Sequence, residues 1–412
     1  MRRKGGRGMS EWKKVKLGEV CDTQYGFTAS TVQQDTGTQF LRITDIVPQL
    51  IDWNTVPYCQ IQEKDREKYL LHKGDIVVAR TGATVGYAKY IKEDVPAVFA
   101  SYLVRLLVNS IDVDRHYVGL CVESNLFKEY IQSISNGSAQ PNANAQMISS
   151  FEINLPPLST QHRIATILSR YDSLIENYQK QIKLLEEAAQ RLYKEWFIDL
   201  RFPGHENTNI IDGVPEGWEK KKVKEVCDTT SGGTPSRSKT EFYTGDILWV
   251  KTKELNDDFI FDTEEKITED AIRNSSAKMV PSGSILMAMY GATIGKLGIA
   301  TKELSCNQAC CVFLLPEDST LRLYLYNWLL NSRTLLISMG KGAAQPNLSQ
   351  DMIKNLEVVI PSSCLLAKFD SKVKPLYRIM SYHSSQIRLL TEARDRLLPK
   401  MMSGEIKIES LN

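Results

Sequence analysis

The stretch STQHRIATILSRYDSLIENYQKQIKLLEEAAQRLYKEWFIDLRF, residues 159–202, decides the fold, because one face of it is apolar at a strict spacing. Apolar residues recur in alternating steps of four and three, which is the heptad pattern of a long helix that packs along another helix. The stripe consists of Ile164, Leu168, Tyr171, Ile175, Tyr178, Ile182, Leu185, Ala189, Leu192 and Trp196. At 1.5 Å per residue, such a helix is roughly 60 Å long.

The same stripe recurs 205 residues later, so the chain supplies its own partner helix. The second stripe consists of Phe369, Val373, Leu376, Met380, His383, Ile387, Leu390, Arg394, Leu397 and Met401. His383 and Arg394 are polar, and we expect each either to pair across the coiled coil or to extend to solvent. Pro375 also lies inside the stripe, so the helix is expected either to kink there or to begin near Lys374.

Further blocks repeat in the same order, so the whole chain is a tandem duplication. Val-Cys-Asp occurs at 20–22 and 226–228, and Gly-Ala-Thr-Val/Ile-Gly occurs at 82–86 and 291–295. A loop that contains Gln-Pro-Asn occurs at 137–142 and again at 342–347. The offset between the copies drifts by only a few residues, as expected from small insertions in loops. Each copy should therefore be one globular domain followed by one long helix.

The globular part of each copy is predicted to be mixed α/β and rich in strands. Apolar runs that follow turns predict strands at 75–79 and 284–289, and further β-rich runs lie at 97–108 and 309–315. Shorter helical segments are expected at 114–134 and 320–338. The predicted organisation is a disordered extension at 1–9, a first domain at 10–158, a first long helix at 159–203, a linker at 204–217, a second domain at 218–361, a second long helix at 362–404 and a C-terminal tail at 405–412.

The composition is that of an ordinary soluble globular protein, with 412 residues, 42% hydrophobic and 24% charged. No apolar run is long enough to predict a transmembrane helix. The net charge of +2 argues weakly against a protein that binds DNA by bulk charge alone. The eight cysteines follow no disulfide or zinc-site spacing, which favours free thiols in a reducing cytosol and no metal site.

No catalytic or cofactor-binding motif is found, so we predict no catalytic residue. The segment from Gly291 to Leu297 lacks the spacing of a phosphate-binding loop, and no Gly-x-Gly-x-x-Gly or His-Glu-x-x-His occurs. The five histidines are scattered, and none has a histidine at the equivalent position of the other copy.

Both copies instead carry polar and glycine-rich loops that suit contact with DNA. Arg and Lys can pair with guanine and Gln and Asn with adenine, while Gly allows close approach of the backbone. The alternative is structural: the Gly-Ala-Thr blocks can be corners between strands, and the Gln-Pro-Asn blocks can be turns. The candidate DNA-contacting residues are Arg42, Thr44, Arg80, Thr81, Lys89, Gln140 and Asn142 in the first copy, and Lys251, Lys253, Tyr290, Lys296, Gln345 and Asn347 in the second.

The ordered set of blocks resembles the specificity subunit of type I restriction-modification systems. The resemblance rests on the Gly-Ala-Thr-Ile-Gly-Lys block, the Gln-Pro-Asn blocks, the Leu-Pro-Pro-Leu entry at 155–158 and the Trp-Phe exit at 196–197. It implies two target recognition domains, each reading half of a bipartite, asymmetric site in double-stranded DNA. It also implies that the long helices pack as an antiparallel coiled coil that sets the half-site spacing.

The same resemblance implies the partners of the chain. Two methyltransferase subunits would dock on it, and the restriction and motor subunits would join that complex. The chain itself would hold no S-adenosylmethionine, ATP or metal, and it would act in the prokaryotic cytoplasm, at the nucleoid through its DNA. Two other readings stay open at this point: a coiled-coil scaffold that never touches DNA, and a self-sufficient methyltransferase.

Overall fold

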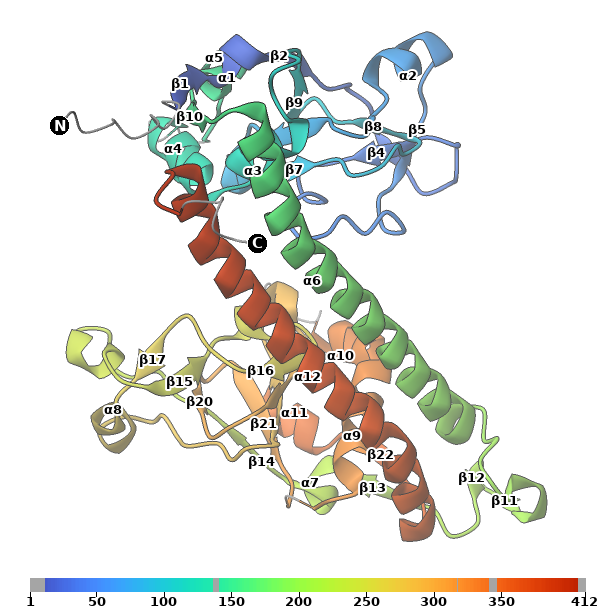
Figure 1. Cartoon of the computed structure of the whole chain (residues 1–412). Coiled ribbons are helices and arrows are strands. Elements are labelled where there is room, and N and C mark those ends of the chain that lie inside the picture. Colours follow the sequence, from blue (N-terminus) through green and yellow to red (C-terminus); the bar gives the residue numbers. More distant parts are fainter. Residues whose placement is uncertain (1–11, 136–140, 317, 341–346, 407–412) are drawn as a thin grey trace, which may run out of the picture. The chain divides into compact units, whose positions relative to one another are not determined.

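The computed structural model describes residues 12–135, 141–316, 318–340 and 347–406, which fall into two compact units (Figure 1). Unit 1 comprises residues 1–176 and 389–412, and unit 2 comprises residues 177–388. Both long helices therefore pass from one unit into the other, at 176/177 and at 388/389. The predicted extension at 1–9 lies outside the described residues, as does the tail from 407 onward.

The core of unit 1 is a four-stranded antiparallel sheet in the order β2-β9-β6-β7, formed by Cys21–Tyr25, Leu103–Val108, Ile76–Ala79 and Ala88–Tyr90. A second sheet has the order β3-β5-β4-β8, formed by Thr31–Val32, Tyr58–Cys59, Gln39–Leu41 and Ala97–Phe99. Its β4 and β8 are parallel. A two-stranded ladder pairs β1 (Lys13–Lys16) with β10 (Glu152–Leu155).

Unit 2 repeats this plan, with one more strand in its main sheet and one fewer in its second sheet. Its main sheet has the order β14-β21-β18-β19-β16, formed by Asp228–Ser231, Cys310–Leu314, Ile285–Ala288, Leu297–Ala300 and Asp258–Ile260. A smaller sheet has the order β17-β15-β20, formed by Lys266–Ile267, Ile247–Val250 and Ser305–Cys306, with β15 and β20 parallel. The ladder of β13 (Glu219–Lys222) and β22 (Glu357–Ile360) matches that of β1 and β10. The duplication and the mixed α/β fold predicted from the sequence are confirmed.

The helices of the two globular parts also match. Unit 1 has α1 (Leu17–Val20), α2 (Glu63–Tyr69), α3 (Arg115–Val122), α4 (Asn125–Ser135) and α5 (Ala145–Ser149). Unit 2 has α7 (Val223–Val226), α8 (Glu269–Arg273), α9 (Leu321–Asn331), α10 (Arg333–Gly340) and α11 (Gln350–Lys354). Each of the segments expected at 114–134 and 320–338 is thus two helices. In unit 1 the break is stabilised by Ser124, whose hydroxyl donates to the Cys121 carbonyl.

The first long helix is α6, Leu158–Tyr193, which continues as a π-helical stretch at Lys194–Ile198. The second is α12, Ser363–Met402, which runs without interruption through Pro375. The expectation that this helix begins near Lys374 is therefore wrong. Pro375 lies on the exposed side, between the buried Val373 and the half-buried Leu376. There the missing backbone N–H costs the helix one hydrogen bond, while the apolar stripe still packs.

In unit 1 the two long helices pack in opposite directions. The contacts of Arg394 explain why a charged residue occurs in the apolar stripe. Ile164 and Leu168 of α6 lie in one core with Leu398 and Met401 of α12. Arg394 Nη1 donates to Asp172 Oδ1 at 2.8 Å, so the guanidinium pairs across the helices as one of the two alternatives predicted. Because both side chains are largely buried, loss of either partner would leave a charge without compensation.

In unit 2 the helices are again antiparallel, since contacts shift toward the start of α12 as α6 proceeds. The ring of Tyr178 stacks on that of His383 at 4.6 Å, and Trp196 packs on Phe369 at 6.0 Å. His383 is buried, and neither of its ring nitrogens has a hydrogen-bond partner in the described structure. Burial lowers the pKa of His383, so the imidazole is neutral and fits an apolar interface. The predicted antiparallel coiled coil is confirmed.

Unit 1 contains a buried ion pair at positions where unit 2 has uncharged residues. Arg105 Nη1 on β9 lies 3.0 Å from Asp75 Oδ2, and both side chains are less than 10% exposed. The guanidinium also donates to the carbonyls of Leu70 and Lys68 and to the side chain of Gln24. At the equivalent positions unit 2 has the buried Ser284 and Val312, as the strand registers show. Equivalent buried positions thus carry two charged residues in one copy and two uncharged residues in the other.

Candidate nucleic-acid interface

The residue before the Gly-Ala-Thr corner of each copy is paired with the asparagine that ends the Gln-Pro-Asn block. Residues 82–84 and 291–293 form short 3-10 turns between antiparallel strands, as the structural alternative expected. In unit 1 an isolated bridge pairs Thr81 with Asn142, and in unit 2 an equivalent bridge pairs Tyr290 with Asn347. Candidates that are far apart in sequence thus become neighbours in both units. Gln140 and Gln345 lie outside the described residues.

Arg80 contacts both an aromatic ring and an amide side chain in unit 1. Its guanidinium lies 4.9 Å from the ring centroid of Tyr25, and its Nη2 donates to Asn142 Oδ1 at 3.3 Å. The backbone N–H of Arg80 donates to the carbonyl of Tyr102, whose side chain is 58% exposed. Arg80, Tyr25 and Asn142 offer a cation, an aromatic ring and an amide in mutual contact, with the exposed Tyr102 adjacent along the backbone, and such groups contact bases and phosphates.

Arg42 and Lys251 occupy equivalent places directly after β4 and β15, and an acid three residues later binds each of them. Asp45 accepts from the Arg42 backbone N–H and from its guanidinium, at 2.8 and 2.7 Å. Glu254 accepts from the Lys251 backbone N–H at 2.7 Å. The shared acid at the third position closes the turn in both copies. Thr44 lies exposed within the turn of unit 1.

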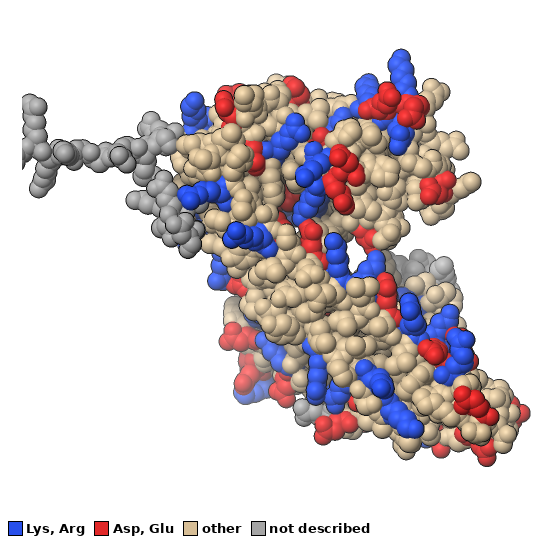
Figure 2. All heavy atoms as spheres, turned by 45° about the vertical axis from the view of Figure 1, so that its right-hand side comes forward, with Lys and Arg blue, Asp and Glu red and all other residues tan. Residues whose placement is uncertain are grey.

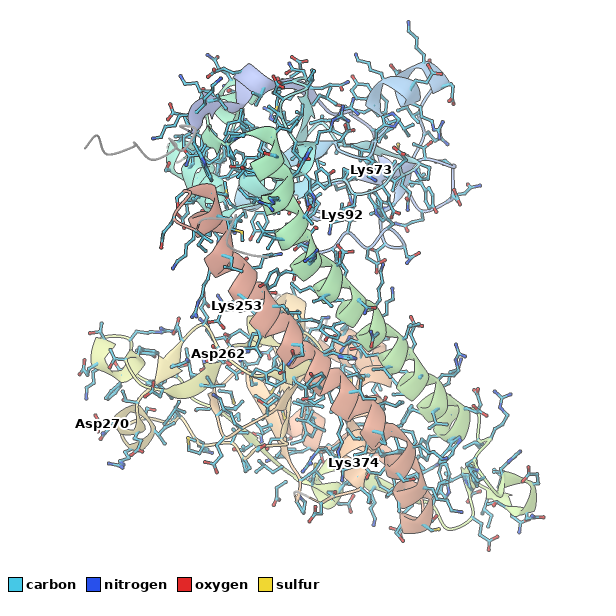
Figure 3. The ribbon with its side chains drawn as sticks, in the orientation of Figure 1. Lys73, Lys92, Lys253, Asp262, Asp270 and Lys374 are labelled. Atoms are coloured by element: carbon cyan, nitrogen blue, oxygen red, sulfur yellow. The ribbon has the colours of Figure 1, made fainter. Side chains whose placement is uncertain are left out.

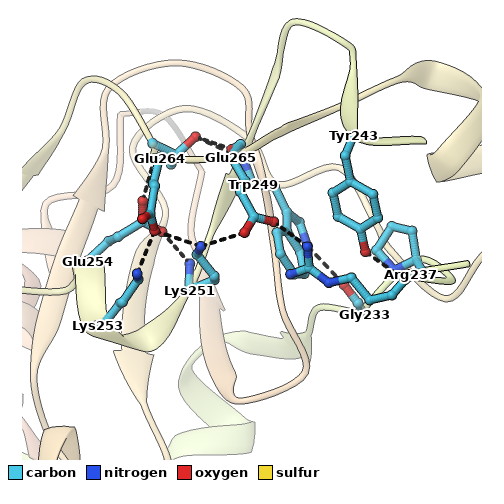
Figure 4. Close-up of polar contacts among 11 residues, drawn as sticks. Gly233, Arg237, Tyr243, Trp249, Lys251, Lys253, Glu254, Glu264 and Glu265 are labelled. Carbon is cyan, nitrogen blue, oxygen red and sulfur yellow. Dashed lines mark hydrogen bonds and ion pairs between the residues drawn. The ribbon is translucent and has the colours of Figure 1, made fainter. Parts of the chain in front are cut away.

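Lys251 and Lys253 belong to a charge network in unit 2 (Figure 4). Lys251 Nζ donates to Glu264 and Glu265 at 2.8 and 2.9 Å, and Lys253 Nζ lies 2.5 Å from Glu264. Hydrogen bonds from these two ammonium groups lower the pKa of Glu264 to about 2, so its carboxylate stays ionised. The side chain of Lys253 is 61% exposed at the surface of unit 2 (Figure 3).

The remaining two lysine candidates, Lys89 and Lys296, bind acceptors within their own units. Lys89 Nζ donates to the carbonyl of Gln49 at 3.0 Å beside a cavity of about 260 Å³ that Glu123 and Asp172 also line. Burial lowers the pKa of Lys89, and the charge of Glu123 opposes that effect. Lys296 Nζ pairs with Asp257 at 2.8 Å.

Three residues of these surfaces were missed in the sequence: Tyr25, Tyr102 and Arg237. Tyr25 and Tyr102 are separated by most of the first domain, and the sheet brings both beside Arg80. Arg237 lies in the loop between β14 and β15, where its guanidinium stacks over Tyr243 at 4.3 Å and over Trp249 at 5.0 Å. Its neighbours Pro235, Ser236 and Ser238 read as an ordinary turn, and only the fold reveals the aromatic faces.

Charges of both signs are interspersed over the face drawn in Figure 2. Within the described residues, no group of three or more His, Cys, Asp or Glu side chains is arranged to hold a metal ion. No helix in the described part of the chain is long and apolar enough to cross a membrane. Eight thiols are free, and all of them except Cys364 are buried.

The duplicated fold matches a family of DNA specificity proteins. The model of the type I restriction modification DNA specificity domain matches residues 9–187 and again residues 215–364. The chain belongs to this family, which confirms the resemblance seen in the sequence. Both matched regions contain a corner and loop of the kind described above.

Individual relatives cover most of the chain. It is 28% identical over 348 residues to the MjaIX specificity subunit of Methanocaldococcus jannaschii, covering 82% of this chain and 79% of that protein. It is 24% identical to the HindI specificity subunit of Haemophilus influenzae, covering 97% and 100%. The crystal structure of a type I S subunit from M. genitalium shares the fold, with a TM-score of 0.57 and 15% identity over 95% of this chain and 96% of that one.

Proposed function

We propose that this chain is the non-catalytic DNA-reading subunit of a type I restriction-modification complex, in which each unit reads one half of a bipartite, asymmetric DNA site. Partner subunits would carry the methyltransferase and nuclease activities. One observation carries the proposal: the two units share a backbone plan but differ in side chain at equivalent positions next to the Gly-Ala-Thr corner. Arg80 corresponds to Met289 and Thr81 to Tyr290, while Asn142 and Asn347 are the same.

The contacts support distinct roles for the candidate residues. Arg80, Thr81 and Asn142 form the proposed reading surface of unit 1, together with Tyr25 and Tyr102. Tyr290 and Asn347 form the corresponding surface of unit 2, and Thr44 and Lys253 lie at exposed turns where they can meet the DNA backbone. Four other candidates bind carboxylates or carbonyls within the protein, and we propose that they hold the loops in place. They are Arg42, Lys89, Lys251 and Lys296.

Exchange of one domain tests this function. Residues 12–155 would be replaced by the matching domain of another specificity subunit, and the chimaera would be co-expressed with its methyltransferase. Genome-wide mapping of methylated bases should show a new first half-motif, an unchanged second half-motif and an unchanged gap. Retention of the original first half-motif would refute the proposal. The reciprocal exchange of residues 219–360 is the control, since it should change only the second half.

The helices offer two matched surfaces for partner subunits. The segments QIKLLEEAAQRL at 181–192 and QIRLLTEARDRL at 386–397 are identical at eight of twelve positions. Some of the identical residues face solvent, where packing within the chain does not require them: Leu184 is 65% exposed and Leu389 46% exposed. Exposed leucines at equivalent places of a duplicated chain fit two copies of one partner. We therefore assign these two surfaces to the two methyltransferase subunits.

Introduction of a negative charge at these leucines should change the number of bound methyltransferase subunits. Burial of a leucine contributes about 1.5–3 kcal/mol, so Leu184→Glu or Leu389→Glu should weaken one docking site by roughly 10-fold to 150-fold. Native mass spectrometry should then show one bound methyltransferase subunit for each single variant and none for the double variant. Ile111→Glu is the control, because Ile111 is 89% exposed in a loop outside the helices. Two bound subunits in both single variants would contradict the assignment.

A further inference from the structure

Arg237 is held in one orientation by two aromatic rings and a carboxylate (Figure 4). Its guanidinium stacks over Tyr243 and Trp249, and Nη1 donates to Glu265 Oε2 at 2.6 Å. Its side chain is nevertheless 54% exposed. The hydrogen bond to Glu265 uses one of the five N–H donors of a guanidinium. Arg237 is thus ordered in advance and still accessible to a ligand.

The support beneath Arg237 is rigid. Trp249 is 1% exposed, and its indole N–H donates to the carbonyl of Gly233 at 3.0 Å. The hydroxyl of Tyr243 donates to the carbonyl of Pro235 at 2.7 Å, which fixes the loop that carries Arg237. A freely moving arginine would lose rotamer entropy on binding, and these contacts remove much of that cost before a ligand arrives.

The charges around Arg237 favour a neutral ligand edge over a phosphate. The network holds three cations, Arg237, Lys251 and Lys253, and three carboxylates, Glu254, Glu264 and Glu265. These formal charges cancel, so a phosphate would meet no net positive field and would lie beside ionised carboxylates. The major-groove edge of guanine presents two uncharged acceptors, O6 and N7, which match the fork of an arginine.

The segment of unit 1 that corresponds to the loop of Arg237 has no such arginine. Residues 26–38, which follow β2 in unit 1, contain no Lys or Arg. The stacked arginine of unit 1 is instead Arg80, over Tyr25, and its equivalent in unit 2 is the buried Met289. Among the described residues, each unit therefore has an aromatic-stacked arginine at a place where the other unit has none: the half-buried Arg80 in unit 1 and the exposed Arg237 in unit 2. Two readers of different half-sites require such a difference.

We propose that Arg237 reads a guanine in the half-site recognised by unit 2, through hydrogen bonds to its major-groove edge. Glu265 is a positioning residue that aims the guanidinium. This inference rests on the proposed function and adds the base class read at one position. The inference predicts that a guanine occurs in the second half-motif, which is the half-motif that changes when residues 219–360 are exchanged.

The test uses the full complex and maps methylation by Arg237→Ala and Arg237→Lys subunits. A bidentate contact is worth about 1–3 kcal/mol of discrimination, so both variants should relax one guanine position of the second half-motif by roughly 5-fold to 150-fold. Arg237→Lys keeps the charge and the stem but lacks the fork, so it separates base reading from loss of folding. The first half-motif should stay unchanged in both variants.

Lys239→Ala is the matched control, since Lys239 is an exposed cation of the same loop. It should weaken binding to all sequences alike without relaxing any position. An unchanged second half-motif in the Arg237 variants would overturn the inference, as would the absence of guanine from that half-motif. Uniformly weaker binding with a smaller salt dependence would also overturn it, because that result marks a phosphate contact. The proposed function would survive each of these outcomes, since it fails only if domain exchange leaves the motif unchanged.

Discussion

Replacement of Asp75 by Ser should lower the free energy of unfolding of unit 1 by about 3–5 kcal/mol, and Arg105→Val should do the same. Each single change leaves one buried charge without its partner. The double variant D75S/R105V reproduces the pair that unit 2 has at the same positions, Ser284 and Val312. Because an uncharged pair needs no compensation for lost hydration, the double variant should recover most of the loss.

Native-state hydrogen exchange across β6 and β9 measures this effect within the full chain, and the strands of unit 2 serve as the internal reference. The coupling between the two substitutions should be at least about 2 kcal/mol. Additive losses in the double variant would show that the two side chains stabilise unit 1 independently of each other, and would contradict the prediction. A lesser part of the loss should persist, because the carbonyls of Lys68 and Leu70 also give up their donor.

Lengthening both long helices by one turn should widen the gap between the two half-motifs by one to two base pairs. Four added helical residues span about 6 Å, against a rise of about 3.4 Å per base pair. The insertions belong between Glu176 and Asn177 and between Arg388 and Leu389, where the helices pass from one unit to the other. There they leave the helix contacts within each unit, such as Asp172 with Arg394 and Tyr178 with His383, in register.

The matched control places four residues in the turn at 212–213, between the short strands β11 (Ile210–Ile211) and β12 (Val214–Pro215). This turn lies inside unit 2, so the methylated motif should keep its gap. Genome-wide methylation mapping of both variants provides the measurement. An unchanged gap after helix insertion, or an equally changed gap after insertion at 212–213, would show that the helices do not set the spacing.

The sequence predicted the long helices and the duplication because both leave a regular pattern. Heptad spacing identifies residues that must share one helix face, and the constant offset of 205 residues aligns Phe369 with Ile164 in the two stripes. Arg394 was recognised as an exception, yet its partner Asp172 lies outside the stripe and gives no spacing signal. The break between α3 and α4 was missed because apolar spacing continues across it, while a single serine hydroxyl stabilises the turn.

Only part of the candidate site could be predicted from the sequence. Comparison of the two copies favours basic residues that occur at equivalent positions. Arg42 and Lys251 are such residues, and they recur because an acid three residues later closes the turn after each strand. A residue that distinguishes two half-sites must differ between the copies. A search for residues common to both copies therefore could not find Arg237. Its aromatic support comes from Trp249 on a neighbouring strand, and its carboxylate from Glu265, 28 residues away. Such contacts are set by the tertiary fold.

The division of the chain also fixes the order in which the protein can fold during synthesis. The core of unit 1 includes Leu398 and Met401, and Asn154 donates to the carbonyl of Met402 at 3.1 Å. All residues of unit 2 precede residue 389, so the domain that is translated second is the first to be complete. The core of the first domain stays incomplete until residues 398–402 have left the ribosome. A stop codon at position 389 would therefore remove part of unit 1 and leave all residues of unit 2 in place.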